Sequence, residues 1–293
     1  MNRVWSSSIM QQIVFMGPFV VLFILITAIP FTFGIYYSFT DWNGLSDKLP
    51  WVGIDNYKFI FTNDTAFIHS LWFTIRFTIV SVILCNVIGF IIAYFLSKPL
   101  KSRNVLRTLF FMPNVIGGII LGFIWLFIYT QGFSTIGEYT GIAFFNLPWL
   151  GTETTAFWAL VIVFVWQGVG YIMVYYIAGL ANVPQDLIEA ATIDGAKTLQ
   201  ILRNIIFPMI MPSITVCIFI STVASFKSFD LNYSLTKGGP FLSTESVAMN
   251  IYTEAFAKNN MGLGAAKAIV FFFIVMIISI IQVYLTKKRE VQV

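Results

Sequence analysis

The segment Glu189–Ala196 reads Glu-Ala-Ala-Thr-Ile-Asp-Gly-Ala and belongs to the one polar passage of an otherwise apolar chain. Pro184 suits the first turn of a helix, where its missing N–H costs nothing, and Gly195 suits a helix end, because glycine accepts left-handed backbone. A second helical run, 197–207, is predicted to stop at Pro208. The pattern predicts a short helix–turn–helix outside the lipid. On composition alone, a plain connector fits equally well.

The composition of the whole chain indicates a membrane protein. Of its 293 residues, 58% are hydrophobic and 10% are charged, and the mean hydropathy is +0.84. Soluble domains carry about 25% charged residues, so we expect lipid to be the solvent of this chain. Cys85 and Cys217 lie in apolar stretches and are interpreted as small hydrophobic residues, without metal or disulfide chemistry. The net charge of +4 could indicate nucleic acid binding, but the basic residues cluster at the ends of apolar stretches, which favours membrane topology instead.

Six apolar stretches are long enough to cross a membrane, which takes about 20 residues. The first stretch exceeds the roughly 7–15-residue apolar core of a cleaved signal and lacks a small-residue cleavage pattern, so we expect it to remain as a helix. We predict an all-α integral membrane protein with six transmembrane helices in a single domain over residues 1–293. The spans are about 13–37, 71–97, 106–130, 155–180, 209–233 and 265–285.

The distribution of Lys and Arg predicts how these spans are oriented. Ten basic residues fall in connections on one side and four on the other, and the positive-inside rule places the richer side in the cytoplasm. Both termini and the loop 182–207 are therefore predicted to be cytoplasmic. The richer side holds Arg3, Lys98, Lys101, Arg103, Arg107, Lys197, Arg203, Lys287, Lys288 and Arg289, and the other side holds Lys48, Lys58, Lys237 and Lys258.

Small, polar and aromatic side chains share one face in each of three predicted spans. In the fifth span, four polar residues fall within a sector of roughly 60° at helical spacing. Such faces suit a polyhydroxylated solute, although small residues also line ordinary contacts between membrane helices. Pro113 is expected to loosen the third span. The faces are Asn114, Gly117, Gly118, Leu121 and Trp125; Phe164, Gln167, Gly168, Tyr171 and Tyr175; and Ser221, Ser225, Ser228 and Asn232.

A few ionisable residues lie in or beside the predicted spans. Lys227 and Asp230 are spaced i, i+3 in the fifth span, and we interpret them as a buried ion pair. The alternative is contact with an acidic solute or a gating role. Arg76 falls within the second span, and Lys267 near an outer end. His69, the only histidine, is interpreted as an interfacial residue rather than a ligand.

The motifs of catalysis and nucleotide binding are absent from the sequence. It contains no phosphate-binding G-x-x-x-x-G-K-[ST] loop, no H-E-x-x-H motif and no cluster of Cys or His. We therefore predict that the chain is not an enzyme and holds no metal or cofactor. A membrane enzyme would need a set of catalytic residues, and an ion-coupled carrier would need more charge inside the spans. If the chain moves a solute uphill, the energy is expected to come from another polypeptide.

The loop from Glu189 to Pro208 closely resembles the EAA loop of ABC-importer membrane subunits, which reads Glu-Ala-Ala, three residues, Gly, and then about a dozen residues to a Leu-Pro-like end. Phe207 stands where leucine is usual. Phe229-Asp230, Leu235–Pro240 and Val52–Tyr57 further resemble the carbohydrate-uptake subclass related to the maltose permease. The resemblance covers nearly the whole chain and implies the six-helix core of a type I ABC importer permease in a bacterial plasma membrane.

This resemblance implies how the work is divided between subunits. The EAA loop would be a coupling helix that docks on a cytoplasmic ATPase dimer, which binds the ATP and Mg²⁺. A second homologous permease would complete the pathway, and an extracytoplasmic binding protein would deliver a sugar or oligosaccharide. An acidic or non-sugar solute, such as a glycerol phosphodiester or a uronate oligosaccharide, is the alternative. The coupling residues would be Glu189, Ala190, Ala191, Asp194 and Gly195.

The solute-contacting positions also follow from the resemblance. Carried over by alignment from the maltose permease, they belong mostly to the three faces described above, although the residue identities differ in part. The expected solute contacts are Asn114, Gly118, Phe164, Gln167, Gly168, Tyr171, Ser225 and Ser228.

Overall fold

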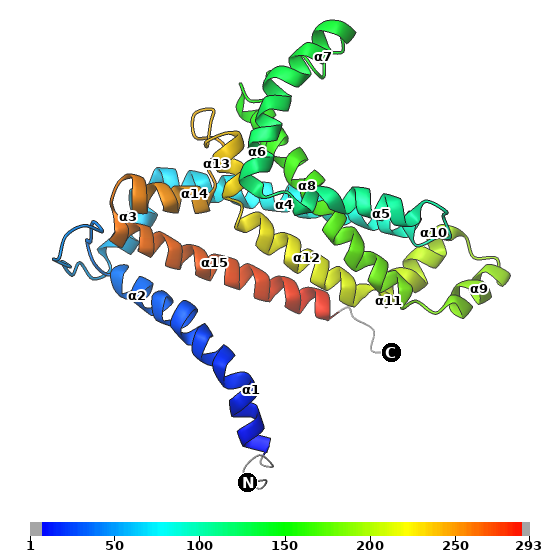
Figure 1. Cartoon of the computed structure of the whole chain (residues 1–293), viewed down its shortest axis with the longest axis horizontal. Coiled ribbons are helices and arrows are strands. Elements are labelled where there is room, and N and C mark those ends of the chain that lie inside the picture. The colour runs from blue at the N-terminus through cyan, green and yellow to red at the C-terminus, as the bar shows by residue number, and fades with distance from the viewer. Residues whose placement is uncertain (1–7, 289–293) are drawn as a thin grey trace. The chain divides into compact units, whose positions relative to one another are not determined.

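The computed structural model describes residues 8–288, which pack as two compact units. The first unit runs to Thr65 and includes Ile251–Phe272, and the second comprises Ala66–Asn250 and the chain from Phe273 onward. Helices form nearly all the regular structure of the described residues (Figure 1). The β pairing among these residues is a single antiparallel bridge between Thr40 and Trp51. The all-α prediction is confirmed for this part of the chain. The single domain over 1–293 stays a prediction.

Five helical stretches of the described chain are long and apolar enough to cross a membrane, and a bent pair can supply a sixth. Three predicted spans agree with the structure to within a few residues, namely 13–37, 155–180 and 265–285. The orientation of the spans stays a prediction. Two of the basic residues on which it depends, Arg3 and Arg289, lie outside the described residues. The long helices are α1 (Ser8–Phe23) with α2 (Ile29–Tyr37), α4 (Thr65–Leu96), α6 (Gly118–Phe127) with α7 (Phe133–Thr140), α8 (Glu153–Ala181), α12 (Met211–Phe226) and α15 (Met261–Lys287).

Helix α8 forms the centre of the second unit. Thr152 caps it, because the Thr155 N–H donates to the Thr152 side-chain oxygen at 3.2 Å. Its middle is enclosed, and Leu160 and Met173 have no exposed surface. A Cβ at Gly170 would overlap the backbone of Phe110, so the glycine lets α5 (Arg103–Phe111) lie directly against α8. Membrane helices pack closely in this way because small residues let their backbones approach.

The predicted third span, 106–130, is wrong as a single helix. Helix α5 ends at Phe111, a tight 3₁₀ turn follows over Met112–Val115, and α6 begins at Gly118. Pro113 removes a backbone donor and clashes with the preceding turn, so the expected loosening becomes a full break. Helix α6 then continues through a π-helical turn into α7, and the candidate span is Gly118–Thr140 rather than one ending near residue 130.

The predicted fifth span, 209–233, is also wrong in its bounds. Helix α12 ends at Phe226, and a separate short helix, α13 (Asp230–Leu235), follows it. The helical run before α12 does not stop at Pro208, as predicted, but continues to Met209 and meets α12 at a bend of 73°. A π-helical turn precedes Pro208 and leaves this proline in the first turn of a new segment, where its missing N–H costs nothing.

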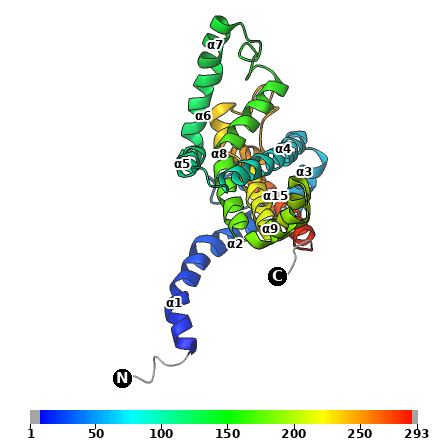
Figure 2. The same cartoon turned by 90° about the vertical axis from the view of Figure 1, so that its right-hand side faces the viewer.

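Helices α7 and α9 (Gln185–Ile193) lie at opposite ends of the second unit. Figures 1 and 2 show α6 and α7 rising together at one end, with α9 at the other. The remaining short helices of the chain are α3 (Asp55–Thr62), α10 (Thr198–Ile201), α11 (Phe207–Met209) and α14 (Val247–Tyr252). The loop after α7 and the segment that carries α9 therefore lie at different ends of the second unit.

Candidate functional site

The segment that carries the predicted coupling residues is a helix closed by a complete C-terminal cap. Helix α9 begins just after Pro184, which stands at the N-cap position rather than inside the first turn. At the other end, the Gly195 N–H donates to the Thr192 carbonyl at 3.1 Å, and the Ala196 N–H donates to the Ala191 carbonyl at 2.9 Å. These two bonds form a Schellman motif. This motif requires left-handed backbone at the residue that follows the C-cap, which is Gly195 here. Gly195 supplies it with a φ of +81°, so its predicted role as helix terminator is confirmed.

The outer surface of this segment combines charge with exposed apolar side chains. Glu189, Ala190 and Asp194 are exposed, and Ala191 is half-buried. Ile193 is 86% exposed, and Leu199, at the start of the next helix, is 74% exposed. Exposed apolar side chains beside carboxylates leave this surface available for contact with another protein.

The inner face of α9 lies against a cavity. Ile188 is half-buried and points toward the ends of α4 and α8, together with Ile201 and Ile206. A cavity of about 340 Å³ lies among these side chains, with Lys98 and Thr198 on its rim. The inner face of α9 therefore meets a cavity rather than a dense core.

The break in the third span brings three predicted solute contacts together. Asn114 lies in the 3₁₀ turn and is half-buried, and Gly118 is the first residue of α6. The Gln167 side chain of α8 donates to the Ile116 carbonyl at 2.9 Å, between the other two positions. The break leaves that carbonyl without a helical partner, so Gln167 satisfies it. A Cβ at Gly118 would contact Asp230, which places the start of α13 beside the same break.

The other predicted contacts on α8 are half-buried. The Phe164 ring meets Phe77 edge-on, with the ring centroids 5.2 Å apart. Gly168 faces Cys85, whose sulfur would lie 3.6 Å from an added Cβ. The Tyr171 hydroxyl lies 3.1 Å from that of Tyr175. The two tyrosines thus present a paired hydrogen-bonding group on one face of the helix.

Ser225 and Ser228 are enclosed in this conformation. Ser225 has no exposed surface, and its hydroxyl donates to the Ser221 carbonyl at 2.7 Å. Ser228 is 9% exposed and donates to Asn232, which in turn donates to the Thr244 carbonyl at 3.0 Å. The predicted face of the fifth span therefore splits, because α12 ends between Ser225 and Ser228. The solute-contacting role of all eight positions stays a prediction.

The sequence reasoning missed a polar connection across three helices. The Tyr176 hydroxyl of α8 donates to Asn86 of α4 at 2.8 Å, and the Asn86 amide donates to the Ser221 hydroxyl of α12 at 2.9 Å. Asn86 was the available signal, since an amide inside a strongly apolar span needs a partner. The three side chains tie α8 and α12, which carry predicted solute contacts, to α4.

The predicted ion pair between Lys227 and Asp230 is wrong. Both residues are exposed, and neither forms an ion pair with any described residue. The prediction assumed one continuous helix, but α12 ends just before Lys227 and α13 starts at Asp230. The i, i+3 geometry that would join the two charges is therefore absent.

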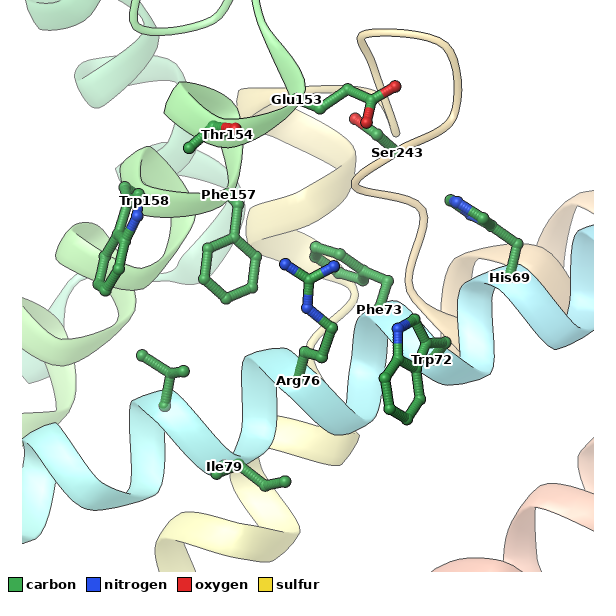
Figure 3. Close-up of a pocket in the computed structure, with 11 residues that line it drawn as sticks. His69, Trp72, Phe73, Arg76, Ile79, Glu153, Thr154, Phe157, Trp158 and Ser243 are labelled. Carbon is green, nitrogen blue, oxygen red and sulfur yellow. The ribbon is translucent and has the colours of Figure 1, made fainter.

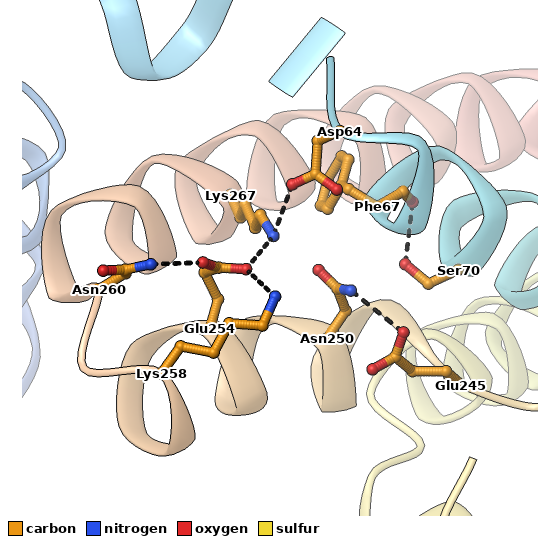
Figure 4. A network of polar contacts seen from close by, with 9 residues as sticks. All are labelled: Asp64, Phe67, Ser70, Glu245, Asn250, Glu254, Lys258, Asn260 and Lys267. Carbon is orange, nitrogen blue, oxygen red and sulfur yellow. Dashed lines mark hydrogen bonds and ion pairs between the residues drawn. The ribbon is translucent and has the colours of Figure 1, made fainter. Parts of the chain in front are cut away.

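A different charge network, not predicted from the sequence, lies in the first unit (Figure 4). Lys267 is fully buried, and its ammonium lies 2.7 Å from Asp64 and 2.8 Å from Glu254. Lys258 and Asn260 complete the contacts of Glu254 at 3.0 and 2.9 Å. Burial opposes ionisation of Glu254, but hydrogen bonds from Asn260, Lys267 and Lys258 outweigh it and lower the pKa of this carboxyl to about 2. The network joins the start of α15 to the segments before α4 and after α14.

No group of three or more His, Cys, Asp or Glu side chains in the described chain is arranged to hold a metal ion. The carboxylates that do meet in this part of the chain surround a lysine ammonium, which already occupies the position of a cation. The predictions that this chain holds no metal and no cofactor stay predictions.

Comparisons with known proteins agree on a membrane component of a transport system. Residues 85–291 match the family described as binding-protein-dependent transport system inner membrane component. A relative from Thermoanaerobacterium thermosulfurigenes, named probable starch degradation products transport system permease protein AmyD, is 46% identical over 95% of this chain and 94% of its own length. The multiple sugar-binding transport system permease protein MsmF of Streptococcus mutans is 36% identical over 88% of this chain and 89% of its own.

A solved structure shares the fold. The structure is described as a bacterial ABC transporter involved in the import of the acidic polysaccharide alginate. It matches with a TM-score of 0.83 and 17% identity, covering 98% of this chain and 99% of that chain.

Proposed function

Because the chain belongs to the family of binding-protein-dependent transport system inner membrane components, we propose that it is a subunit of an ABC importer that carries a sugar or oligosaccharide into the cytoplasm. The geometry of the segment around α9 is the observation that carries this proposal. A rigid, capped helix with exposed Glu189 and Ile193 projects from one end of the second unit. It suits the transmission of force from another protein.

The proposed mechanism places ATP hydrolysis on a separate pair of cytoplasmic ATPase subunits. Their approach and separation would move α9, and the bent connection at Pro208 and Pro212 would pass this movement to α12. Helix α12 is tied to α4 and α8 through Asn86, so the three helices would move together. A second, homologous permease would form the other wall of the pathway. An extracytoplasmic binding protein would deliver the solute to the end opposite α9.

The choice of a sugar rests on the named relatives and on the chemistry of the predicted contacts. The two relatives are named for starch degradation products and for multiple sugars. Gln167, Tyr171 and Tyr175 offer an amide, paired hydroxyls and aromatic rings, which together suit a ring bearing many hydroxyls. An acidic solute is the second candidate, because the ammonium of Lys227 is exposed and forms no ion pair with a described residue.

Co-purification from the native host tests the proposal. The tagged chain is expected to come out of detergent with an ATPase and a second permease, and the complex in liposomes should take up radiolabelled maltotriose only with ATP inside and binding protein outside. Glucuronate oligosaccharides serve as the acidic comparison. Uptake by the isolated chain, without ATPase or ATP, would overturn the proposal. Preference for the acidic oligosaccharide would replace its solute class.

A further inference from the structure

A cavity of about 390 Å³ between the first halves of α4 and α8 is not used by the proposed transport path. Its polar lining includes His69 and Arg76 from α4, Glu153 from the first turn of α8, and Ser243 from the loop before α14. Figure 3 shows Arg76 reaching from α4 toward Phe157, with Trp72 and Trp158 on either side. We call this space the polar cavity.

The charged groups of the polar cavity lack partners in the described chain. The Arg76 guanidinium lies over the Phe157 ring, 5.4 Å from its centroid, and makes no hydrogen bond or ion pair with a described residue. The carboxylate of Glu153 forms no ion pair there either. The Ser243 hydroxyl is buried without a hydrogen-bond partner. Both charges are therefore available to a charged group from outside the described chain.

An apolar groove continues directly from the polar cavity. Trp158 lines both spaces, and the α4 row that starts at Val80 in the polar cavity continues along the groove. The groove is also about 390 Å³ in volume, and its lining is entirely aliphatic, aromatic or proline. From Val80 to Ile92 the row covers about 18 Å at the helical rise, close to the roughly 15 Å of one leaflet's hydrocarbon. The residues that form its walls include Leu84, Ile88, Ile92, Val161, Val165 and Val169.

The polar cavity and the apolar groove together suit an amphiphile rather than a sugar. The Arg76 guanidinium already covers the Phe157 ring face, so that ring is unavailable for stacking on a sugar. Apart from the indole N–H groups of Trp158 and Trp166, the groove offers no polar side chain to hydroxyl groups. On α8, the wall residues Val161 and Val165 lie roughly 90° around the helix from the predicted solute face at Phe164 and Tyr171, at 100° per residue.

The depth of the cavity corresponds to the level of lipid headgroups. Glu153 is the first residue of α8, where that helix enters its apolar run, and Arg76 meets Phe157 one turn further in. Trp72 and Trp158 are 60% and 43% exposed, as expected for aromatic residues at a membrane interface. A long arginine side chain can reach a headgroup from this depth.

We propose that the polar cavity and the apolar groove together bind one phosphatidylethanolamine molecule. Arg76 pairs with the phosphate through two parallel N–H bonds, and Ser243 offers a further hydroxyl donor. Glu153 pairs with the headgroup ammonium. One acyl chain follows the groove between α4 and α8. A purely anionic headgroup, such as phosphoglycerol, would satisfy Arg76 but place negative charge beside Glu153, so the carboxylate makes the site selective for the zwitterion.

Native mass spectrometry of the purified complex tests this site. The complex is incubated with equal amounts of dioleoyl phosphatidylethanolamine and dioleoyl phosphatidylglycerol, and wild type is expected to retain one phosphatidylethanolamine preferentially. Arg76→Gln should lower its retention by about tenfold or more, because charge-assisted hydrogen bonds to phosphate are lost. Glu153→Gln should abolish the preference between the two lipids while leaving one lipid bound. Lys48→Gln removes an exposed cation far outside this cavity in sequence and serves as the matched control.

Two results would overturn the inference. Equal lipid retention by wild type, Arg76→Gln and Lys48→Gln would mean that bound lipid is merely annular. Efficient disulfide cross-linking of Ile79→Cys to an engineered cysteine of the second permease would mean that protein covers this face. Arg76 and Glu153 are exposed and have no ion-pair partner among the described residues, so both variants are expected to fold and assemble normally.

Discussion

Lys267→Met is expected to destabilise the protein by about 3–5 kcal/mol, because it removes the ammonium that lies between the buried carboxylates of Asp64 and Glu254. Lys267 is fully buried, and its ammonium lies within 2.8 Å of both Asp64 and Glu254. Methionine has a similar volume, so the loss measures charge rather than packing. In a thermal melt followed by fluorescence-detected size exclusion, the midpoint should fall by about 10 °C.

Lys258→Met is the matched control for this substitution. Lys258 contacts the same Glu254 oxygen at 3.0 Å, but its side chain is 54% exposed, so its loss should cost less than about 1 kcal/mol. Adding Asp64→Asn and Glu254→Gln to Lys267→Met should restore much of the lost stability, since it removes the two buried carboxylate charges that faced the ammonium. Equal melting midpoints for the two lysine variants would contradict this account.

The pH dependence of the wild type gives a second readout of the same network. The pKa of Glu254 is lowered from 4.5 to about 2 in the folded protein. Its contribution to stability should therefore be complete above pH 4.5 and be lost as the pH falls toward 2. The Lys267→Met variant should lose less stability over this pH interval than the wild type does.

Gly195→Val is expected to release the ATPase while leaving the chain folded in the membrane. Gly195 has a φ of +81°, and no atom lies within 4 Å of an added Cβ, so the substitution strains the backbone without a clash. Left-handed backbone costs an L-residue about 1–2 kcal/mol, and the Schellman bonds from Gly195 and Ala196 depend on it. The amount of ATPase that co-purifies should fall by about tenfold.

The chain provides a matched control at Gly141. This glycine also ends a helix with a positive φ, +67°, and an added Cβ would contact nothing. It follows α7, at the end of the second unit opposite α9 (Figure 2). Gly141→Val should therefore strain its own helix end but retain the ATPase, and Gly195→Asn should retain it too, because asparagine tolerates left-handed backbone. Loss of the ATPase in all three variants would show a general defect in folding.

Local signals in the sequence predicted the C-terminal end of α9 well. The end of α9 at Gly195 follows from the conformational preference of one residue, and neighbouring helices do not alter it. Spans of continuous apolar sequence, such as α8 and α15, were also predictable because length and composition decide them.

The predictions were wrong where contacts between distant residues determine the backbone conformation. The polar residues Lys227, Ser228 and Asp230 are compatible with one continuous helix as well as with a break, so the end of α12 at Phe226 could not be read from composition. The predicted ion pair between Lys227 and Asp230 was wrong for the same reason, because it depended on a continuous helix. The buried contacts of Lys267 join residues separated by up to two hundred positions, and no local pattern connects Asp64 with Glu254. The proline break at Pro113 was foreseen as a weakness, but its extent depends on Gln167 satisfying the freed carbonyl of Ile116.

The stimulation of ATP hydrolysis by solute-loaded binding protein tests the central claim most directly. In liposomes containing the whole complex, Glu189→Ala is expected to remove most of this stimulation and of solute uptake, while the chain stays in the membrane. Glu138→Ala changes an exposed glutamate on α7, at the opposite end of the second unit, and should leave both activities intact. Wild-type stimulation and uptake in Glu189→Ala would contradict the claim that this loop receives force from the ATPase.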